Sequence, residues 1–221
     1  VKHMVRLGEG GFTHNRLQEE TMARTIAVLR GNLAPEGAVI KHSAVPKEMH
    51  RALLRARPFD CEEDAISAIL THKIRPGDAV FIRYEGPKGS GMPEMFYTTE
   101  AISSDPELAA SIALITDGRF SGASKGPAIG HVSPEAAQGG PIALVEEGDL
   151  ISIDVEARKL EIVGIHGEPC APEEVERVLA ERRARWTPRP ARYAEGALGV
   201  FTHLAASPMK GGMMLVPGAQ E

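Results

Sequence analysis

Residues 112–126 read IALITDGRFSGASKG, an apolar run that leads directly into a polar turn rich in glycine. The run from Ile112 to Ile115 is typical of a buried strand. Glycine at every fourth position of the turn allows positive φ angles and lets a ligand approach the backbone closely. We therefore expect Ser121 to lie on a loop at the end of a strand, and the chemistry to be centred there.

The residues around Ser121 give this turn a positive charge. Arg119 and Lys125 flank the serine, and nearby cations favour an anionic substrate or a lowered hydroxyl pKa. Beyond the turn, residues 133–135 have the form of a helix start, with a Ser N-cap, Pro at the first helical position and then an acid. Composition alone leaves a second interpretation open, because a glycine- and serine-rich turn with basic residues is also typical of a solvated loop.

The composition predicts a globular protein that binds neither nucleic acid nor membrane. The 221 residues can bury a sizeable core in one large or two small domains. Hydrophobic content of 43% and charged content of 25% are ordinary, and the net charge of -5 is spread along the chain. No apolar run approaches the roughly 20 residues of a membrane span, and the start lacks the apolar part of a signal peptide.

The two cysteines predict a reduced, cytoplasmic protein. Cys61 and Cys170 lie far apart in the sequence, and neither has the CxxC or Cys/His spacing of a metal centre. An iron-sulfur cluster held by this chain alone is therefore not expected.

Hydrophobic periodicity predicts more strands than helices. Strands are expected at residues 25–29, 38–40, 79–84, 112–115 and 141–145, and an antiparallel hairpin at 150–155 with 159–163. Helices are expected at residues 61–70 and 172–186. Because the strands do not alternate regularly with helices, we predict a mixed α/β fold with a barrel-like sheet and flanking helices.

The sequence contains no internal repeat and no low-complexity linker, so one domain is expected. We assign residues 1–24 to an N-terminal arm and residues 25–216 to the domain. The glycine- and methionine-rich tail from Tyr193 to Val216 is expected to pack on a partner surface.

A second loop, residues 85–95, is rich in glycine and proline and carries Glu94. It follows a predicted strand, as the Ser121 turn does, so both loops can open at the same end of a compact sheet. A carboxylate and a hydroxyl beside basic residues suit metal-assisted proton abstraction, with Glu94 as an oxygen ligand for Mg²⁺. One carboxylate does not make a Mg²⁺ site, and an acid at this position is also typical of a helix start.

A serine hydrolase is the competing chemistry, because Asp117 and His131 lie near Ser121 in the sequence. The Gly-x-Ser-x-Gly turn of such enzymes is absent, since Arg119 stands where the first glycine is required. Triad chemistry is therefore disfavoured. His131, next to the predicted helix start, is expected to be structural.

Five ordered motifs connect the chain to a known family. They are residues 28–37 (VLRGNLAPEG), 83–87 (RYEGP), 91–95 (GMPEM), 116–122 (TDGRFSG) and 130–136 (GHVSPEA). Over roughly residues 25–215 the sequence resembles the C-terminal half of the dihydroxy-acid dehydratase and phosphogluconate dehydratase family. The motifs are long and occur in the family's order, so the match is highly specific.

The resemblance implies a hydro-lyase that removes water from a 2,3-dihydroxy carboxylic acid to give a 2-keto acid, as in branched-chain amino-acid biosynthesis. In the family an iron-sulfur cluster acts on the departing 3-hydroxyl, and Mg²⁺ holds the substrate carboxylate. Carried over by motif, Ser121 is the base that takes the C2 proton and Glu94 is a Mg²⁺ ligand. Arg119, Gly122 and Ser124 support the site. The family fold makes this half a swivelling β/α domain, commonly within a homodimer.

The sequence departs from the family pattern in three respects. The family's cluster cysteines and its other Mg²⁺ ligands, including a carbamylated lysine, lie in an N-terminal half that this sequence does not contain. We therefore expect the chain to be one domain or one subunit of a split enzyme, inactive without that half. Ser121 is followed by Gly-Ala-Ser where dihydroxy-acid dehydratases usually carry Gly-Gly-Thr, and residues 97–108 diverge. The alternatives are a sugar-acid dehydratase, acting on an aldonate or phosphogluconate, and a non-catalytic binding module of the same fold.

Overall fold

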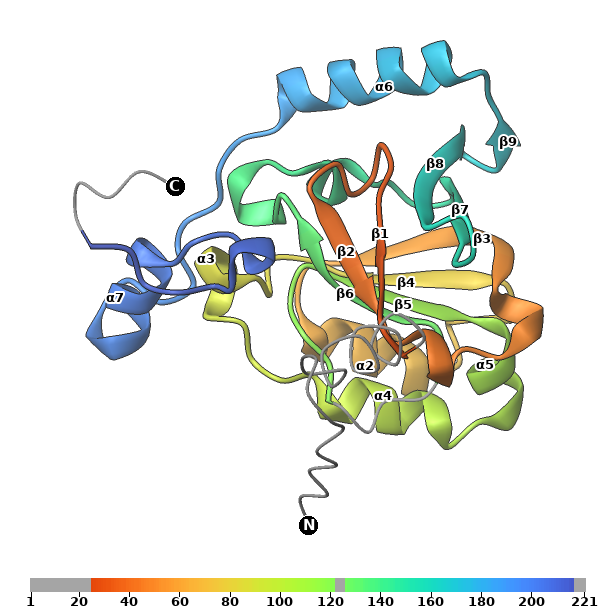
Figure 1. The fold of residues 1–221 in the computed structure, drawn as a ribbon, viewed down its shortest axis with the longest axis horizontal. Helices are drawn as coiled ribbons and strands as arrows, with labels where there is room; N and C mark the ends of the chain where they lie inside the picture. Colours follow the sequence, from red (N-terminus) through yellow and green to blue (C-terminus); the bar gives the residue numbers. More distant parts are fainter. Residues whose placement is uncertain (1–24, 122–125, 217–221) are drawn as a thin grey trace, which may run out of the picture.

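The computed structural model describes residues 25–121 and 126–216, and its centre is one curled sheet (Figure 1). Nine strands of this described part follow the order β1-β2-β6-β5-β4-β3-β7-β8-β9. They are β1 (Ala27–Leu29), β2 (Gly37–Ile40), β3 (Arg51–Phe59), β4 (Asp78–Ile82), β5 (Ala113–Thr116), β6 (Ala128–Ser133), β7 (Leu150–Asp154), β8 (Lys159–Ile165) and β9 (Glu168–Pro169). The predicted mixed α/β fold with a barrel-like sheet is confirmed.

Helices lie on both sides of the sheet. The α-helices are α2 (Glu62–Leu70), α3 (Pro87–Ser90), α4 (Phe96–Ser103), α5 (Pro106–Ser111), α6 (Pro172–Arg185) and α7 (Gly196–Leu204). Short 3-10 turns are η1 (His42–Ala44), η2 (Lys47–Met49), η3 (Ala136–Gln138), η4 (Pro141–Leu144) and η5 (Pro208–Lys210). Figure 1 shows α2, α4 and α5 together on one face and α6 across the other side. None of these helices is long and apolar enough to cross a bilayer.

The centre of the sheet is parallel and its two sides are antiparallel. Strands β3, β4, β5 and β6 run in the same direction, while β2 and β7 run against their neighbours. Loops that leave the carboxyl ends of β4 and β5 therefore emerge side by side, because Ile82 pairs with Thr116 at the last register position. Ligands commonly bind at this edge of a parallel sheet.

Contacts between β1 and β8 close the curl of the sheet. The Arg30 amide donates to the carbonyl of Arg158, and the Leu160 amide donates to the carbonyl of Arg30, both at 2.9 Å. The Asn32 side chain then exchanges two hydrogen bonds with the backbone of Ile162, at 2.7 and 2.8 Å. A Cβ on Gly31 would lie 2.2 Å from the Leu160 carbonyl oxygen, so only glycine allows this approach.

Alternate residues of the central strands face two different apolar cores. Phe81 and Ile115 point into the core inside the curled sheet, while Val80 and Leu114 point into the core beneath α2, α4 and α5. All four side chains are at most 5% exposed. Burial on both faces explains why these strands appear as continuous apolar runs in the sequence.

Two sequence predictions of secondary structure are wrong. Residues 133–135 do not start a helix: Ser133 is the last residue of β6, its carbonyl accepts from the Glu36 amide, and only the 3-10 turn η3 follows. Residues 141–144 form the 3-10 turn η4 instead of a strand. Arginine side chains bind the carbonyls of residues 143–145, so these groups are not available for a strand ladder. The predicted hairpin is confirmed as β7 and β8.

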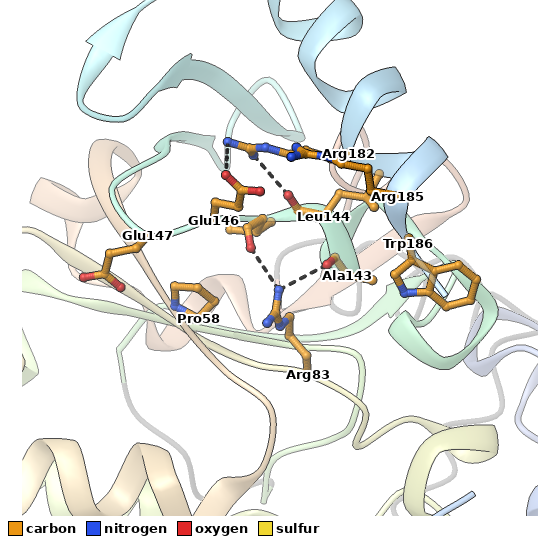
Figure 2. Close-up of a pocket in the computed structure, with 10 residues that line it drawn as sticks. Pro58, Arg83, Ala143, Leu144, Glu146, Glu147, Arg182, Arg185 and Trp186 are labelled. Carbon is orange, nitrogen blue, oxygen red and sulfur yellow. Dashed lines mark hydrogen bonds and ion pairs between the residues drawn. The ribbon is translucent and has the colours of Figure 1, made fainter. Parts of the chain in front are cut away.

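A buried ion pair attaches α6 to the sheet. Arg182 and Asp149 are 5% and 0% exposed, and the guanidinium Nη2 lies 3.0 Å from Asp149 Oδ1. Arg182 also donates to the Leu144 carbonyl and pairs with Glu146 at 3.1 Å (Figure 2). Two charges removed from water stabilise a fold only when both are satisfied; here oxygen acceptors surround Arg182, and Asp149 accepts from Arg182 and from the Glu146 amide.

Two buried carboxylates fix the loops at the carboxyl end of the parallel strands. Asp117 accepts from the amides of Tyr84, Glu85 and Ala136 at 2.8 to 3.1 Å. Glu135 accepts from the amides of Lys88 and Gly89 at 3.0 Å. Both carboxylates are 0% exposed, so their hydrogen bonds replace hydration that burial removed.

Burial makes the carboxyl groups of Asp117 and Glu135 harder to ionise. Burial raises the pKa of Glu135 to about 7 and that of Asp117 to about 6, and the donated amide hydrogen bonds oppose both shifts. The charge of Asp117 is the second cause that raises the pKa of Glu135. Each carboxylate is therefore less acidic in the folded chain than in the unfolded chain.

Replacing Arg182 by Ala is expected to lower the free energy of unfolding by about 3–5 kcal/mol, because Asp149 would remain buried without its cation. Urea denaturation measures the loss. Arg185→Ala is the matched control, since Arg185 is exposed on the last turn of the same helix, and a change within about 0.5 kcal/mol is expected. Equal losses in the two variants would contradict the role of the ion pair.

Replacing Glu135 by Gln is expected to change the pH dependence of stability. Between the ordinary pKa of 4.5 and about 7, the folded chain holds the extra proton, so wild-type stability falls as pH rises through this window. The Gln variant lacks this decline. Its stability relative to wild type should therefore rise between pH 4.5 and 8, by on the order of 2–3 kcal/mol. A difference that stays constant over this range in denaturation experiments would contradict the raised pKa.

Candidate active site

The two loops that carry Glu94 and Ser121 meet beside the ends of β4 and β5. Glu94 and Arg119 form a short parallel bridge, and the Met95 amide donates to the Arg119 carbonyl at 3.1 Å. Arg119 Nε also donates to the Met92 carbonyl at 2.9 Å. The structure thus places Glu94, Arg119 and Ser121 in one region.

The Glu94 carboxylate remains accessible. Its side chain is 43% exposed, and its oxygen lies 3.9 Å from Arg119 Nη1, whose side chain is 49% exposed. Ion pairs this exposed and this long contribute little free energy. A cation that approaches from solvent can therefore compete with Arg119 for the carboxylate.

Ser121 lines a cavity of about 300 Å³ between its own loop, β2 and β6. Apolar side chains form part of its wall, and two residues with nitrogen-bearing side chains, one just after β2 and one in β6, also line it. The lining includes Ile26, Val39, Phe120 and Ala128 as apolar groups, and Lys41 and His131 as nitrogen-bearing groups. The cavity therefore suits a small ligand with an anionic end.

Gly118 allows the serine loop to pack closely against the Glu94 loop. A Cβ at this position would lie 2.7 Å from the Glu85 carbonyl oxygen and 3.0 Å from Met95. The Gly118 carbonyl accepts from the His131 amide at 2.9 Å, which joins the serine loop to β6. Any larger residue at 118 would separate these segments.

His131 lines the same cavity as Ser121. The structural role that the sequence predicts for it stays a prediction. Burial and the nearby Arg119 guanidinium lower its pKa, so the imidazole is neutral at neutral pH. Its place in the motif GHVSPEA was the available signal, but a motif alone does not show where a side chain points.

Two of the predicted supporting residues, Gly122 and Ser124, lie outside the described residues, as does Lys125. Arg119 is placed, and it contacts the Glu94 loop through both its backbone and its side chain.

The residues in the described ranges do not complete a metal site. Within 25–121 and 126–216, no group of three His, Cys, Asp or Glu side chains is arranged to hold a metal ion. Glu94 fits the part of one oxygen ligand for Mg²⁺, because it is accessible and weakly paired. Cys61 and Cys170 are both free thiols on separate elements, and they do not fit an iron-sulfur cluster.

A second cavity, of about 430 Å³, contains three arginines but offers no comparable anion site (Figure 2). Arg83 donates to the carbonyls of Ala143 and Val145 and pairs with Asp60. Arg182 is engaged by Asp149 and Glu146. Their donors hold the neighbouring loop, so the function of Arg83 and Arg182 is structural, while the third arginine, Arg185, is exposed on the last turn of α6.

Comparison with known proteins identifies related sequences over most of the chain. The family model described as "Dihydroxy-acid/6-phosphogluconate dehydratase C-terminal" matches residues 16–212. Dihydroxy-acid dehydratase of Agathobacter rectalis is 54% identical over 196 residues, which are 88% of this chain and 33% of that protein. The enzymes of the same name from Clostridium kluyveri and Ignicoccus hospitalis are 52% and 50% identical, over 87% and 86% of this chain.

The chain spans about a third of the length of these relatives. The family match covers both loops of the candidate site and nearly all of the curled sheet. The expected resemblance is therefore confirmed, and the chain belongs to the dihydroxy-acid and 6-phosphogluconate dehydratase family, of which it represents the C-terminal domain.

Proposed function

We propose that this chain forms one side of the active site of a hydro-lyase that converts a 2,3-dihydroxy carboxylic acid to a 2-keto acid. Ser121 is the base that removes the C2 proton, and Glu94 is one ligand of Mg²⁺. The observation that carries the proposal is the direct contact between the Glu94 loop and the Arg119–Ser121 loop. Relatives that are about half identical to this chain over the matched third of their length are named dihydroxy-acid dehydratases, which supports this substrate class over sugar acids.

The chain's own groups account for substrate binding and proton removal. Lys41, which lines the Ser121 cavity, and Arg119, two residues before Ser121, supply positive charge, which favours a carboxylate substrate. Bound Mg²⁺ would supply the positive charge that stabilises developing negative charge on oxygen. The apolar wall of the cavity, Ile26 and Val39, suits a short alkyl side chain better than a polyhydroxylated one. We therefore place the reaction in branched-chain amino-acid biosynthesis, in the cytoplasm.

The remaining parts of the site must come from another polypeptide segment. Because the described residues hold neither a Mg²⁺ ligand set nor a cluster site, we propose that an N-terminal dehydratase half supplies the iron-sulfur cluster and the other Mg²⁺ ligands. Exposed apolar side chains on α7 and the segment after it provide a surface for such a partner or for a homodimer. They are Leu198, Val200, Met213, Met214 and Val216, which are 46–74% exposed.

The decisive assay is the turnover of 2,3-dihydroxyisovalerate under anaerobic conditions with Mg²⁺. The chain is tested alone and then together with a cysteine-bearing N-terminal half, and activity is expected only in the combined sample. Turnover of aldonates or phosphogluconate in place of this substrate would establish the sugar-acid alternative. No turnover of any of these acids would leave a non-catalytic binding module of the same fold.

Replacing Ser121 by Ala is expected to lower kcat of the combined enzyme by about 10²–10⁴-fold, because the group that takes the C2 proton is lost. The melting temperature is measured in parallel, so that loss of the base is distinguished from loss of folding. Ser104→Ala, on the exposed end of α4, is the control and should retain full activity. Retained turnover in the Ser121 variant would remove this residue from the base role.

Replacing Glu94 by Gln is expected to raise the Mg²⁺ concentration needed for half-maximal activity by about tenfold or more, because a charged oxygen ligand becomes neutral. Calorimetric titration of the combined enzyme with Mg²⁺ measures the same loss without turnover. Glu107→Gln, an exposed acid on α5, is the matched control. Unchanged Mg²⁺ affinity in the Glu94 variant would exclude it as a ligand.

A further inference from the structure

A β-bulge interrupts β6 at His131. Val39 of β2 pairs with Gly130, but Gly37, two residues earlier, pairs with Ser133, three residues later. One extra residue is therefore inserted in β6 between these two pairs. His131 has a φ of +57°, a left-handed conformation that is uncommon for a residue other than glycine and unexpected within a strand.

The bulge changes the direction in which the His131 side chain points. In a regular strand His131 would share a face with Ile129, which is fully buried in the core of the curled sheet. With the extra residue, Val132 joins Ile129 in that core, and His131 lines the Ser121 cavity with Ala128 and Gly130. A bulge that redirects one side chain is a recurrent feature beside active sites.

Two other histidines with positive φ provide a comparison. His72 and His166 have φ values of 55° and 47°, but both are exposed in turns, where this conformation is ordinary. His131 alone of these three is partly buried and faces a cavity. Within the part of the chain that the structure describes, its imidazole makes no hydrogen bond or ion pair, so its unprotonated ring nitrogen is available to accept a proton.

We propose that His131 is the proton-relay partner of Ser121. The inference rests on the proposed function, because it assumes that Ser121 removes the C2 proton. His131 receives the proton that Ser121 has taken: the Ser121 Oγ–H bond breaks and an imidazole N–H bond forms. The imidazolium then gives this proton to the hydroxide that leaves C3, so that water departs and both side chains return to their starting states.

The charges around His131 keep it able to accept a proton. Arg119 from the serine loop is the charged side chain that acts on it, and Lys41, just after β2, lines the same cavity; both are cationic. Ser121 and Thr25 are its neutral polar neighbours in the cavity. Burial and the Arg119 guanidinium favour the neutral imidazole, so the relay is ready at neutral pH and is lost when acid protonates the ring.

The test is the pH dependence of kcat/KM for the combined enzyme with His131→Asn. Asparagine tolerates positive φ, so the bulge is kept while the titrating ring is lost. We expect kcat to fall about 100-fold and the decline of wild-type kcat/KM at acidic pH, where the ring takes up a proton, to disappear. His131→Gly, which also accepts this conformation, should recover part of its rate when imidazole is added. His72→Asn is the control for a histidine with positive φ outside the cavity.

Several outcomes would overturn the inference. If His131→Asn retains kcat within twofold together with the acidic decline, or if imidazole does not rescue His131→Gly, His131 does not relay the proton. Ser121→Ala in the same assay separates the two proposals. An inactive Ser121 variant beside a fully active His131 variant rejects only the relay, while an active Ser121 variant rejects the proposed base itself. Side-chain NMR adds a readout without turnover: Ser121→Ala should shift the His131 ring signals and leave those of His72 unchanged.

Discussion

The carboxylate of Asp117 is the interaction on which the site depends. Its two oxygens accept amides from Tyr84, Glu85 and Ala136, which belong to the segments that follow β4 and β6, while Asp117 itself follows β5. One fully buried side chain thus fixes three chain segments at the same edge of the sheet. Removing it would leave three buried amides without an acceptor, each at a cost of about 1–3 kcal/mol. Glu94 and Ser121 both lie on segments held in this way.

The arrangement of the strands explains why the site forms at this edge. Four parallel strands bring the β4 and β5 loops out side by side, and the antiparallel strands on both sides let the sheet curl until Arg30 reaches Leu160. Closure through the side chain of Asn32 leaves an interior that apolar side chains fill completely. The ligand site is consequently at the rim of the sheet and not in its interior.

The sequence predicted the features that are local and missed those that need a distant partner. The strand at 112–115 and the hairpin of β7 and β8 follow from periodicity alone. Residues 141–144 have a strand-like composition, but Arg83 and Arg182 bind the neighbouring carbonyls from far along the chain. The direction of His131 depends on the register of β2 against β6, which neither strand encodes by itself. The residue pattern offered Glu94 as one oxygen ligand for Mg²⁺, but only the resemblance to a family supplied the hydro-lyase reaction.

The charged side chains fall into two groups: buried ones that stabilise the fold, and exposed ones that are accessible to a ligand. Asp117, Glu135 and the Arg182–Asp149 pair are buried and fully hydrogen-bonded, so they are bound to the fold and unavailable to a substrate. Glu94 and Arg119 are more than 40% exposed and only loosely paired, so each can exchange its partner for a ligand at little cost. A metal site that is completed by ligands from another segment requires both features. Buried carboxylates must fix the loops that carry the site, and the charged side chains on those loops must stay accessible to the other segment.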